Sequence, residues 1–150
     1  MKKILAWIAL VMVSVLTYAS HDGVRQDKEK DSGKVIAMDK EMFLNDVFDY
    51  QTSKEWKYKG DKPAIIDFYA NWCGPCRLTT PIMKKLAKEY AGKIIIYKVN
   101  VDKQKELAAL FDASSIPLFV FIPMEGQPQY IRGAAKKAIY KKIIDEFLLK

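Results

Sequence analysis

Apolar residues form two kinds of pattern along the chain, and the first kind consists of short continuous runs. Three runs are long enough for buried strands, residues 64–69, 94–99 and 118–122, and shorter ones lie at residues 35–38 and 129–131. Continuous apolar runs are typical of a parallel sheet covered on both faces, because neither side of such a strand meets water. The pattern therefore predicts a largely buried central sheet.

The second kind of pattern places apolar residues three or four positions apart, which predicts amphipathic helices between the strands. Asp39 is expected to cap the first helix, and Gly92 to end the second. The apolar positions of the four helices are Phe43, Val47 and Tyr50; Ile82, Met83, Leu86, Ala87 and Tyr90; Leu107, Leu110 and Phe111; and Ala135, Ile139, Ile143 and Phe147.

The order of these elements indicates the fold class. The last two strands are separated by a hairpin-sized segment at residues 124–127, which predicts that they pair antiparallel. Strands separated by helices, followed by a hairpin and a final helix, predict an α/β layered domain with a mixed sheet.

The first 34 residues have a different composition. Lys2 and Lys3 are followed by an uncharged apolar run at residues 4–16, and small residues precede a predicted cut after Ala19, so residues 1–19 have the layout of a secretory signal peptide. The run has 13 residues, fewer than the roughly 20 that a membrane-spanning helix needs. We expect cleavage and a periplasmic or secreted protein; the alternative is a membrane anchor formed by residues 4–19.

The polar residues 20–34 have no apolar period and are predicted to form a flexible tether, which leaves residues 35–150 as one domain. The chain carries 25 Lys and Arg against 18 Asp and Glu, a net charge of +7 that falls to +5 without residues 1–19. The densest basic stretch, residues 136–142, fits the solvent-exposed face of the last, amphipathic helix better than a basic surface that binds nucleic acid. We therefore expect no nucleic-acid partner.

Both cysteines lie in the segment Trp72-Cys73-Gly74-Pro75-Cys76, between the first long strand and the next helix. A Cys-x-x-Cys pair in that position is typical of a redox site, since two intervening residues let both sulfurs meet within one turn. Pro75 suits the first helical turn. Free N–H groups and the helix dipole there stabilise a thiolate, so Cys73 is expected to attack and the deeper, less exposed Cys76 to resolve the mixed disulfide.

Other uses of two cysteines are disfavoured. They cannot complete a four-ligand zinc site, and Arg77 stands where covalent haem attachment requires histidine. A purely structural disulfide across a four-residue loop would add little stability. We expect no metal and no cofactor beyond a redox-active disulfide formed by Cys73 and Cys76.

Three further residues are unusual for their positions. Asp67 interrupts an apolar strand, so it is either a functional acid with a pKa raised by burial or half of a structural pair with Lys98. Pro117 cannot donate to a sheet ladder, and a cis bond that places the Ile116 backbone beside the sulfurs would explain its presence. Trp72 fits a substrate-contact surface, with core packing as the alternative.

Residues 67–77, from Asp67 to Arg77, resemble the active-site stretch of thioredoxins, and the resemblance extends over residues 35–150. It implies the thioredoxin fold, a mixed sheet of about five strands flanked by helices on both faces. It also implies that Asp67 exchanges a proton with Cys76 and that Lys98 neighbours this acid. The other matching positions are Pro81 in the active-site helix, Ile116 and Pro117 at the cis-proline site, and Gly126 and Gly133 at turns.

The resemblance also implies an activity. Gly74-Pro75 is the dipeptide of reducing thioredoxins, whose potential lies near −270 mV against about −120 mV for a strong periplasmic oxidant. We expect a monomeric, exported protein-disulfide reductase that a membrane electron donor re-reduces. The catalytic residues would be Cys73, Cys76, Asp67 and Lys98, and the substrate-binding residues Trp72, Gly74, Pro75, Ile116, Pro117 and Gly133.

Two alternatives stay open: a net dithiol oxidase or isomerase in oxidative folding, and a redox-inert binding module with the same scaffold. The sequence also departs from the common thioredoxin pattern at three positions. Tyr69 stands where many relatives have tryptophan, Arg77 where lysine is usual, and Leu118 where threonine is frequent. The last change alters the lip of the expected substrate groove.

Overall fold

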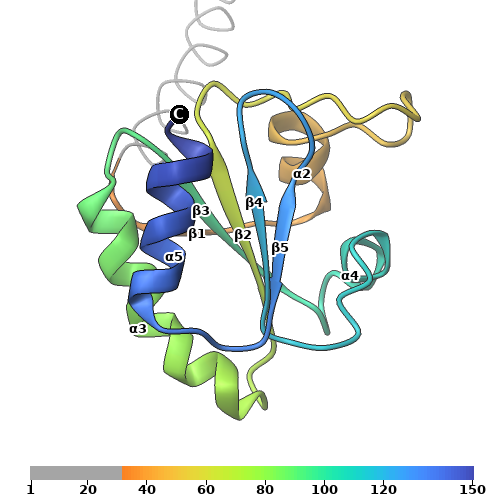
Figure 1. Ribbon diagram of the computed structural model, residues 1–150. Helices are drawn as coiled ribbons and strands as arrows, with labels where there is room; N and C mark the ends of the chain where they lie inside the picture. The colour runs from red at the N-terminus through yellow and green to blue at the C-terminus, as the bar shows by residue number, and fades with distance from the viewer. Residues whose placement is uncertain (1–31) are drawn as a thin grey trace, which may run out of the picture.

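The computed structural model describes residues 32–150, so the predicted signal and most of the predicted tether lie outside the described residues. A five-stranded sheet in the order β1-β3-β2-β4-β5 forms the centre of the molecule (Figure 1). The strands are β1 (Val35–Ala37), β2 (Ala64–Tyr69), β3 (Ile95–Asn100), β4 (Leu118–Ile122) and β5 (Gln129–Arg132). The helices are α2 (Lys40–Asp46), α3 (Gly74–Glu89), α4 (Lys105–Leu110) and α5 (Lys137–Ile143), which continues into a π-helical turn, η1 (Ile144–Leu148).

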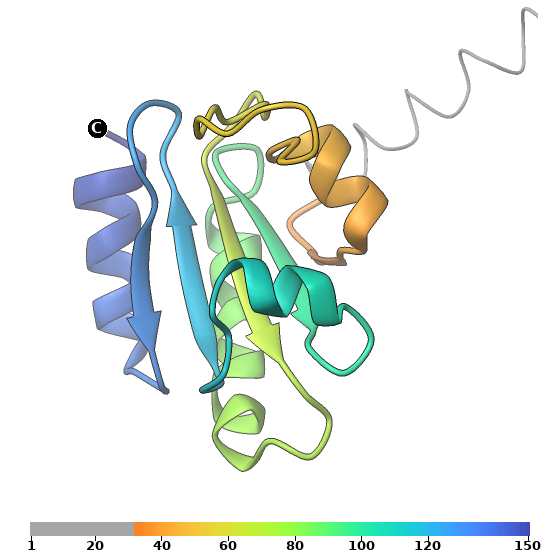
Figure 2. The same ribbon diagram turned by 90° about the vertical axis from the view of Figure 1, so that its right-hand side faces the viewer.

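The sheet is mixed, as the sequence predicts. Strands β1, β3 and β2 are parallel, whereas β4 runs antiparallel to β2 and β5 antiparallel to β4. Helices α3 and α5 lie on one face, and α2 and α4 lie on the other (Figure 2). The thioredoxin fold expected from the sequence is confirmed.

Two apolar cores form because neighbouring strand residues point to opposite faces. Ile65 packs with Met83 and Tyr140 under α3 and α5, whereas Ile66 and Phe68 pack under α2 and α4. The central strands β2 and β4 are buried on both faces, which is why they appear as continuous apolar runs in the sequence.

The predicted extent of the first helix was wrong. Asp39 caps it by accepting a hydrogen bond from the Met42 N–H at 2.9 Å, but the helix ends at Asp46. Val47 is its C-cap, and the Val47 carbonyl accepts the Lys59 N–H, so the chain turns away before Tyr50. The buried side chain of Val47 continues the apolar pattern beyond the helix itself.

The predicted buried face of the last helix was wrong at Ile139; Ala135, Ile143 and Phe147 are partly buried and pack against the core, but they are not its centre. Ile139 is 48% exposed, whereas Tyr140, Ile144 and Leu148 are buried. The Tyr140 ring packs 4.8 Å from the Phe119 ring, and its hydroxyl accepts the Ala135 N–H at 2.9 Å. A tyrosine whose polar tip is satisfied in this way can occupy the centre of an apolar face.

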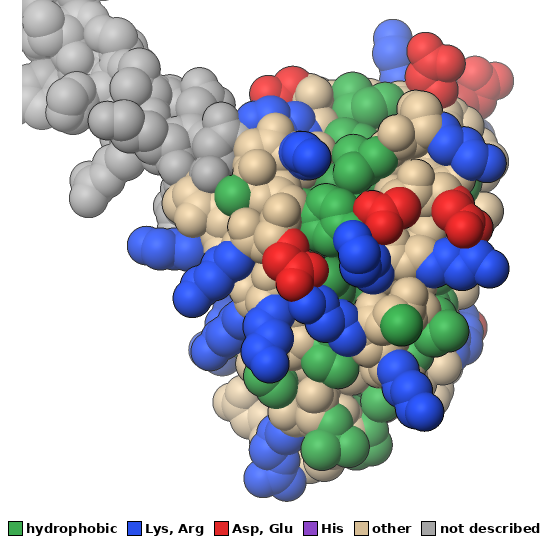
Figure 3. Space-filling view, turned by 60° about the vertical axis from the view of Figure 1, so that its left-hand side comes forward, with side chains coloured by type: hydrophobic (Ala, Val, Ile, Leu, Met, Phe, Trp, Pro, Cys, Tyr) green, Lys and Arg blue, Asp and Glu red, His purple; other side chains and the backbone are tan. Residues whose placement is uncertain are grey.

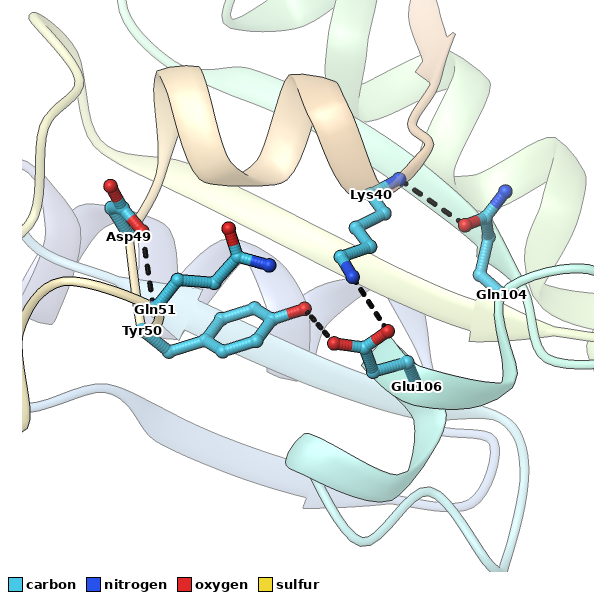
Figure 4. Close-up of polar contacts among 6 residues, drawn as sticks. All are labelled: Lys40, Asp49, Tyr50, Gln51, Gln104 and Glu106. Atoms are coloured by element: carbon cyan, nitrogen blue, oxygen red, sulfur yellow. Dashed lines mark hydrogen bonds and ion pairs between the residues drawn. The ribbon is translucent and has the colours of Figure 1, made fainter.

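Polar contacts join α2 to α4 on the second face (Figure 4). The Lys40 ammonium lies 2.8 Å from Glu106, which also accepts the Tyr50 hydroxyl at 2.7 Å. The Lys40 N–H donates to the Gln104 side chain at 3.2 Å. Burial and the neighbouring Glu106 raise the pKa of Tyr50 to about 12, so the hydroxyl stays a donor at neutral pH.

The chain reaches β1 beside the far end of α3. A Cβ atom on Gly33 would lie 3.1 Å from the Ala91 Cβ and 3.2 Å from the Ala87 carbonyl, and Gly33 has a φ of +65°, which favours glycine. Within residues 32–150, no helix has the length and apolar character needed to span a bilayer.

Candidate active site

Cys73 and Cys76 form a disulfide between the end of β2 and the start of α3, with their Cα atoms 5.3 Å apart. Cys73 is the N-cap of α3, and its Sγ accepts the Cys76 N–H at 3.2 Å. Pro75 occupies the first helical turn, where its missing N–H costs no intrahelical bond. A thiolate on Cys73 would therefore meet a backbone donor and the positive end of a 16-residue helix.

The expected difference in exposure between the two cysteines is not present. Both are 3% exposed, and both pack with Ala70. The physical reason is the bond itself, which holds the two sulfurs in one packed cluster that Tyr69, Val101 and Ile116 surround. Gly74 and Pro75 above them are exposed, and a Cβ on Gly74 would meet no atom within 4 Å. The open approach to the disulfide therefore passes over these two residues.

A second segment approaches the disulfide from the start of β4. The Ile116–Pro117 peptide bond is cis, and the Ile116 carbonyl oxygen lies 3.8 Å from the Cys73 Sγ. The Gly133 N–H donates to the Pro117 carbonyl at 2.7 Å, and Gly133 has a φ of +87°. The structure thus brings the predicted substrate-binding backbone of Ile116 to the sulfurs and fixes it through β5.

Trp72 lies beside the disulfide with 68% of its surface exposed, which excludes the core-packing alternative. Its indole N–H donates to the Asp102 carboxylate at 3.0 Å. Asp102 itself follows β3 and is positioned by Asn100, whose side chain accepts the Asp102 N–H at 2.9 Å. Sequence reasoning missed Asp102, because thirty residues separate it from Trp72 and no local pattern connects them.

Asp67 is 5% exposed and lies next to Lys98 in the register of β2 and β3. Its Oδ1 has no hydrogen-bond partner among the described residues. Burial raises the pKa of Asp67 to about 7, and the charge of Lys98 works against this rise. The register makes the predicted acid and its lysine neighbours, and the Lys98 ammonium lies 5.8 Å from the centre of the Tyr69 ring.

The active-site helix has a second local feature that the sequence analysis did not use. The hydroxyls of Thr79 and Thr80 both donate to the Cys76 carbonyl at 3.0 Å. Pro81, a proline inside the helix, directly follows Thr80. Threonines that bond back to the preceding turn are known to bend helices, as prolines do. The dipeptide Thr79-Thr80 before a proline was the feature of the sequence that could have indicated this bend.

Across residues 32–150, no group of three or more His, Cys, Asp or Glu could hold a metal ion.

Comparison with known proteins agrees with this geometry. The family model described as Thioredoxin matches residues 41–146. The thioredoxin of Borreliella burgdorferi is 44% identical over 112 residues, which cover 75% of this chain and 96% of that protein. The chloroplastic M-type thioredoxin of Spinacia oleracea is 38% identical over 95 residues, 63% of this chain and 52% of that one. A crystal structure of chloroplastic thioredoxin z has a TM-score of 0.64 at 24% identity, covers 75% of this chain and 93% of its own, and shows the likeness of fold.

Proposed function

Because the chain belongs to the thioredoxin family, we propose that it reduces protein disulfides by dithiol–disulfide exchange through Cys73 and Cys76. The family and the disulfide together support thiol–disulfide oxidoreductase chemistry. The observation that carries the proposal is the position of Cys73, which caps α3 beneath an open surface and touches the Ile116 carbonyl.

The reaction starts from the reduced pair. The Cys73 thiolate attacks a substrate disulfide, so a bond forms between Cys73 Sγ and one substrate sulfur while the substrate S–S bond breaks, and the other substrate sulfur leaves as a thiolate that takes up a proton. The Cys76 thiolate then attacks Cys73 Sγ. The Cys73–Cys76 disulfide forms while the bond between Cys73 Sγ and the substrate sulfur breaks, and that sulfur leaves as a thiolate that takes up a proton. The substrate, now a dithiol, carries away the two electrons.

Asp67 is the group we assign to the proton of Cys76. A carboxyl with a pKa of about 7 is half protonated near neutral pH, so it can both accept and return a proton. Its unpartnered Oδ1 supports this role, since a carboxylate held in a structural pair would have its oxygens occupied. Lys98 limits the rise of the pKa and keeps the acid in the useful range.

Substrate would bind across Trp72, Gly74 and Pro75, with its backbone against Ile116. The exposed indole of Trp72, fixed by Asp102, offers an apolar contact beside the sulfurs. The Ile116–Pro117 segment, which the Gly133 N–H holds, offers backbone groups to an extended substrate strand. These groups are why we assign protein disulfides as substrates.

The proposal also covers the direction of electron transfer and the cellular location of the protein. Gly74-Pro75 supports a reductase, and the layout of residues 1–19 supports export to the periplasm or the exterior, with anchoring by residues 4–19 as the alternative. An exported reductase needs an electron donor that acts across the membrane, because soluble cytoplasmic reductants do not reach it. The donor would be a membrane-bound dithiol protein that returns two electrons to the Cys73–Cys76 disulfide.

The test combines a potential with a trapping experiment. Equilibration against glutathione buffers should place the Cys73–Cys76 couple near −250 mV or below, whereas a value near −150 mV or above would favour a net oxidase or isomerase. The variant Cys76→Ser should accumulate substrate complexes that a thiol reagent cleaves. If the variant lacking both cysteines binds the same partners unchanged, and the unmodified protein reduces no disulfide, the protein is a binding module.

A further inference from the structure

A cavity of about 350 Å³ lies between α3 and the sheet, apart from the open surface over the disulfide. Its walls come from residues 33–35, the ends of β2 and β3, and the middle turns of α3. Its volume falls within the range of small-molecule sites, about 300–1,000 Å³. The cavity is therefore large enough for a ligand and is not explained by the exchange reaction itself.

Four lysines line this cavity: Lys34, Lys84, Lys88 and Lys98. None of the four forms an ion pair within residues 32–150. On the neighbouring α5, by contrast, Lys137 pairs with Glu89. Figure 3 shows many Lys and Arg side chains on this side of the molecule, with several Asp and Glu side chains among them. Four ammonium groups around one cavity, with Asp67 as the one acidic residue among the described residues of its lining, attract an anion.

The inner wall of the cavity is apolar. Val35, Tyr69 and Met83 contribute side chains to it, and Met83 is fully buried. A bare inorganic anion would leave this wall without a partner. An anion that carries an aromatic or short aliphatic body would bury the body against these side chains and keep its charge among the lysines.

The carboxyl of Asp67 also lines the cavity, and its Oδ1 lacks a hydrogen-bond partner among the described residues. A protonated carboxyl can donate a hydrogen bond to an anionic oxygen, whereas an ionised one repels it. Two titratable groups act on this carboxyl: Lys98, its neighbour in the register of β2 and β3, and Tyr140 of α5. The cavity lining adds Lys34, Lys84, Lys88 and Tyr69. An anion in this cavity would thus favour the protonated form of Asp67.

We propose that this cavity binds a small organic anion with an apolar body, a carboxylate or sulfonate, and that its occupant holds Asp67 in the protonated form. Binding itself does not depend on the proposed function. Its effect on exchange does, because a carboxyl that stays protonated cannot accept the proton of Cys76.

Naphthalene-2-sulfonate is a suitable probe, since its charge does not change between pH 6 and pH 8. NMR titration of the oxidised full-length protein should shift the amide signals of Val35, Thr80 and Met83. The neutral naphthalene-2-sulfonamide and inorganic sulfate, which carry only the apolar body or only the charge, should bind at least about tenfold more weakly. Equal binding of the sulfonamide, or no shift at these residues at millimolar concentration, would overturn the proposal.

Matched lysine variants locate the site. Lys84→Gln and Lys88→Gln should each weaken the probe about fivefold, the scale of one exposed charge contact. Lys85→Gln, on the same helix but outside the cavity lining, removes the same charge and should change the affinity less than twofold. Equal weakening in all three variants would mean that the probe responds only to the overall charge.

The pH dependence of probe binding tests whether the occupant of the cavity favours the protonated form of Asp67. Binding should weaken by up to about tenfold from pH 6 to pH 8 if only the protonated carboxyl accepts the probe. Asp67→Asn should abolish this pH dependence while still binding the probe. A pH-independent affinity in the unmodified protein would overturn the link. In the reduced protein, probe at a concentration equal to its dissociation constant should slow disulfide exchange. At the same concentration the effect should be about threefold smaller in Lys84→Gln, because a fivefold weaker site is filled to about one sixth instead of one half.

The binding results stand whether or not exchange is observed. A protein that binds the probe but reduces no disulfide would overturn the proposed function alone. A protein that reduces disulfides but does not bind the probe would overturn the present inference alone.

Discussion

Asp67 of β2 and Lys98 of β3 are neighbours in the sheet register, yet they form no ion pair within residues 32–150, and the Oδ1 of Asp67 is left without a hydrogen bond. The lysine therefore acts on the acid through space and not through a bonded pair. This relationship separates the functional interpretation of Asp67 from the structural one, because a satisfied pair would have held the carboxylate ionised.

Lys98→Met should raise the pKa of Asp67 further above about 7, since it removes the cation that opposes the effect of burial. The titration of the Asp67 carboxyl carbon, followed by NMR in the oxidised protein, measures this directly. Lys105→Met removes an exposed cation from α4 and is the control; it should leave the titration unchanged. An unchanged or lowered value in Lys98→Met would show that the lysine charge does not reach the acid.

Asp67→Asn should increase the free energy of unfolding at pH 8.5 by about 2–4 kcal/mol and change it little at pH 4. The folded-state pKa of about 7 lies above the unfolded value of about 3.9, so the folded protein binds the extra proton. Stability therefore falls as the pH rises from about 4 to 7, and Asn removes this loss. Denaturant unfolding of the oxidised protein at both pH values measures the effect.

The exposed Asp61→Asn is the matched control for this change, and its stability difference should not depend on pH. Disulfide exchange should slow in Asp67→Asn at the same time, because no acid remains to take the proton of Cys76. A variant that is more stable but exchanges at the normal rate would remove Asp67 from the mechanism.

Trp72→Ala should raise the KM for a protein disulfide about tenfold, as expected for the loss of an exposed aromatic anchor. Stability should change by less than about 0.5 kcal/mol, because most of the side chain is in water. Reduction of a small-molecule disulfide should be unaffected. Tyr130→Ala removes another exposed aromatic from β5 and should leave the KM unchanged; equal effects of both variants would contradict the assignment of Trp72.

Gly133→Ala and Gly126→Ala form a matched pair. Both glycines have a positive φ, +87° and +90°, and a Cβ on either would meet no atom within 4 Å. Each change should therefore lower the free energy of unfolding by about 1–2 kcal/mol through the backbone alone. Only Gly133→Ala should also raise the KM for a protein disulfide, because its N–H holds the Pro117 carbonyl. A raised KM in both variants would mean that the effect follows stability.

The sequence predicted those parts of the fold that depend on neighbouring residues. Strand β4 occupies the predicted positions 118–122, because a strand buried on both faces needs a continuous apolar run. The disulfide joins the two cysteines of the Cys-x-x-Cys segment, as expected, and Asp39 caps its helix as expected. In each case the determining interactions are local or follow from burial alone.

Contacts between distant segments could not be predicted in the same way. The centre of the buried face of α5 is Tyr140 and not Ile139, because the Ala135 N–H donates a hydrogen bond to the Tyr140 hydroxyl. The spacing of apolar residues does not predict such a contact. The partnership of Trp72 with Asp102, and the four lysines around one cavity, arise only when separate elements fold together. The equal burial of the two cysteines depends on the residues of three segments that surround the bond.

The contact of Gly33 with the last turn of α3 decides how the protein can be handled. Helix α3 begins beside the disulfide and has 16 residues, so its far end lies about 24 Å away. A bead or a fusion partner joined directly at Ser32 would therefore sit at the end of the molecule opposite the disulfide. The domain can be immobilised through its amino-terminal side without covering the surface that meets a substrate.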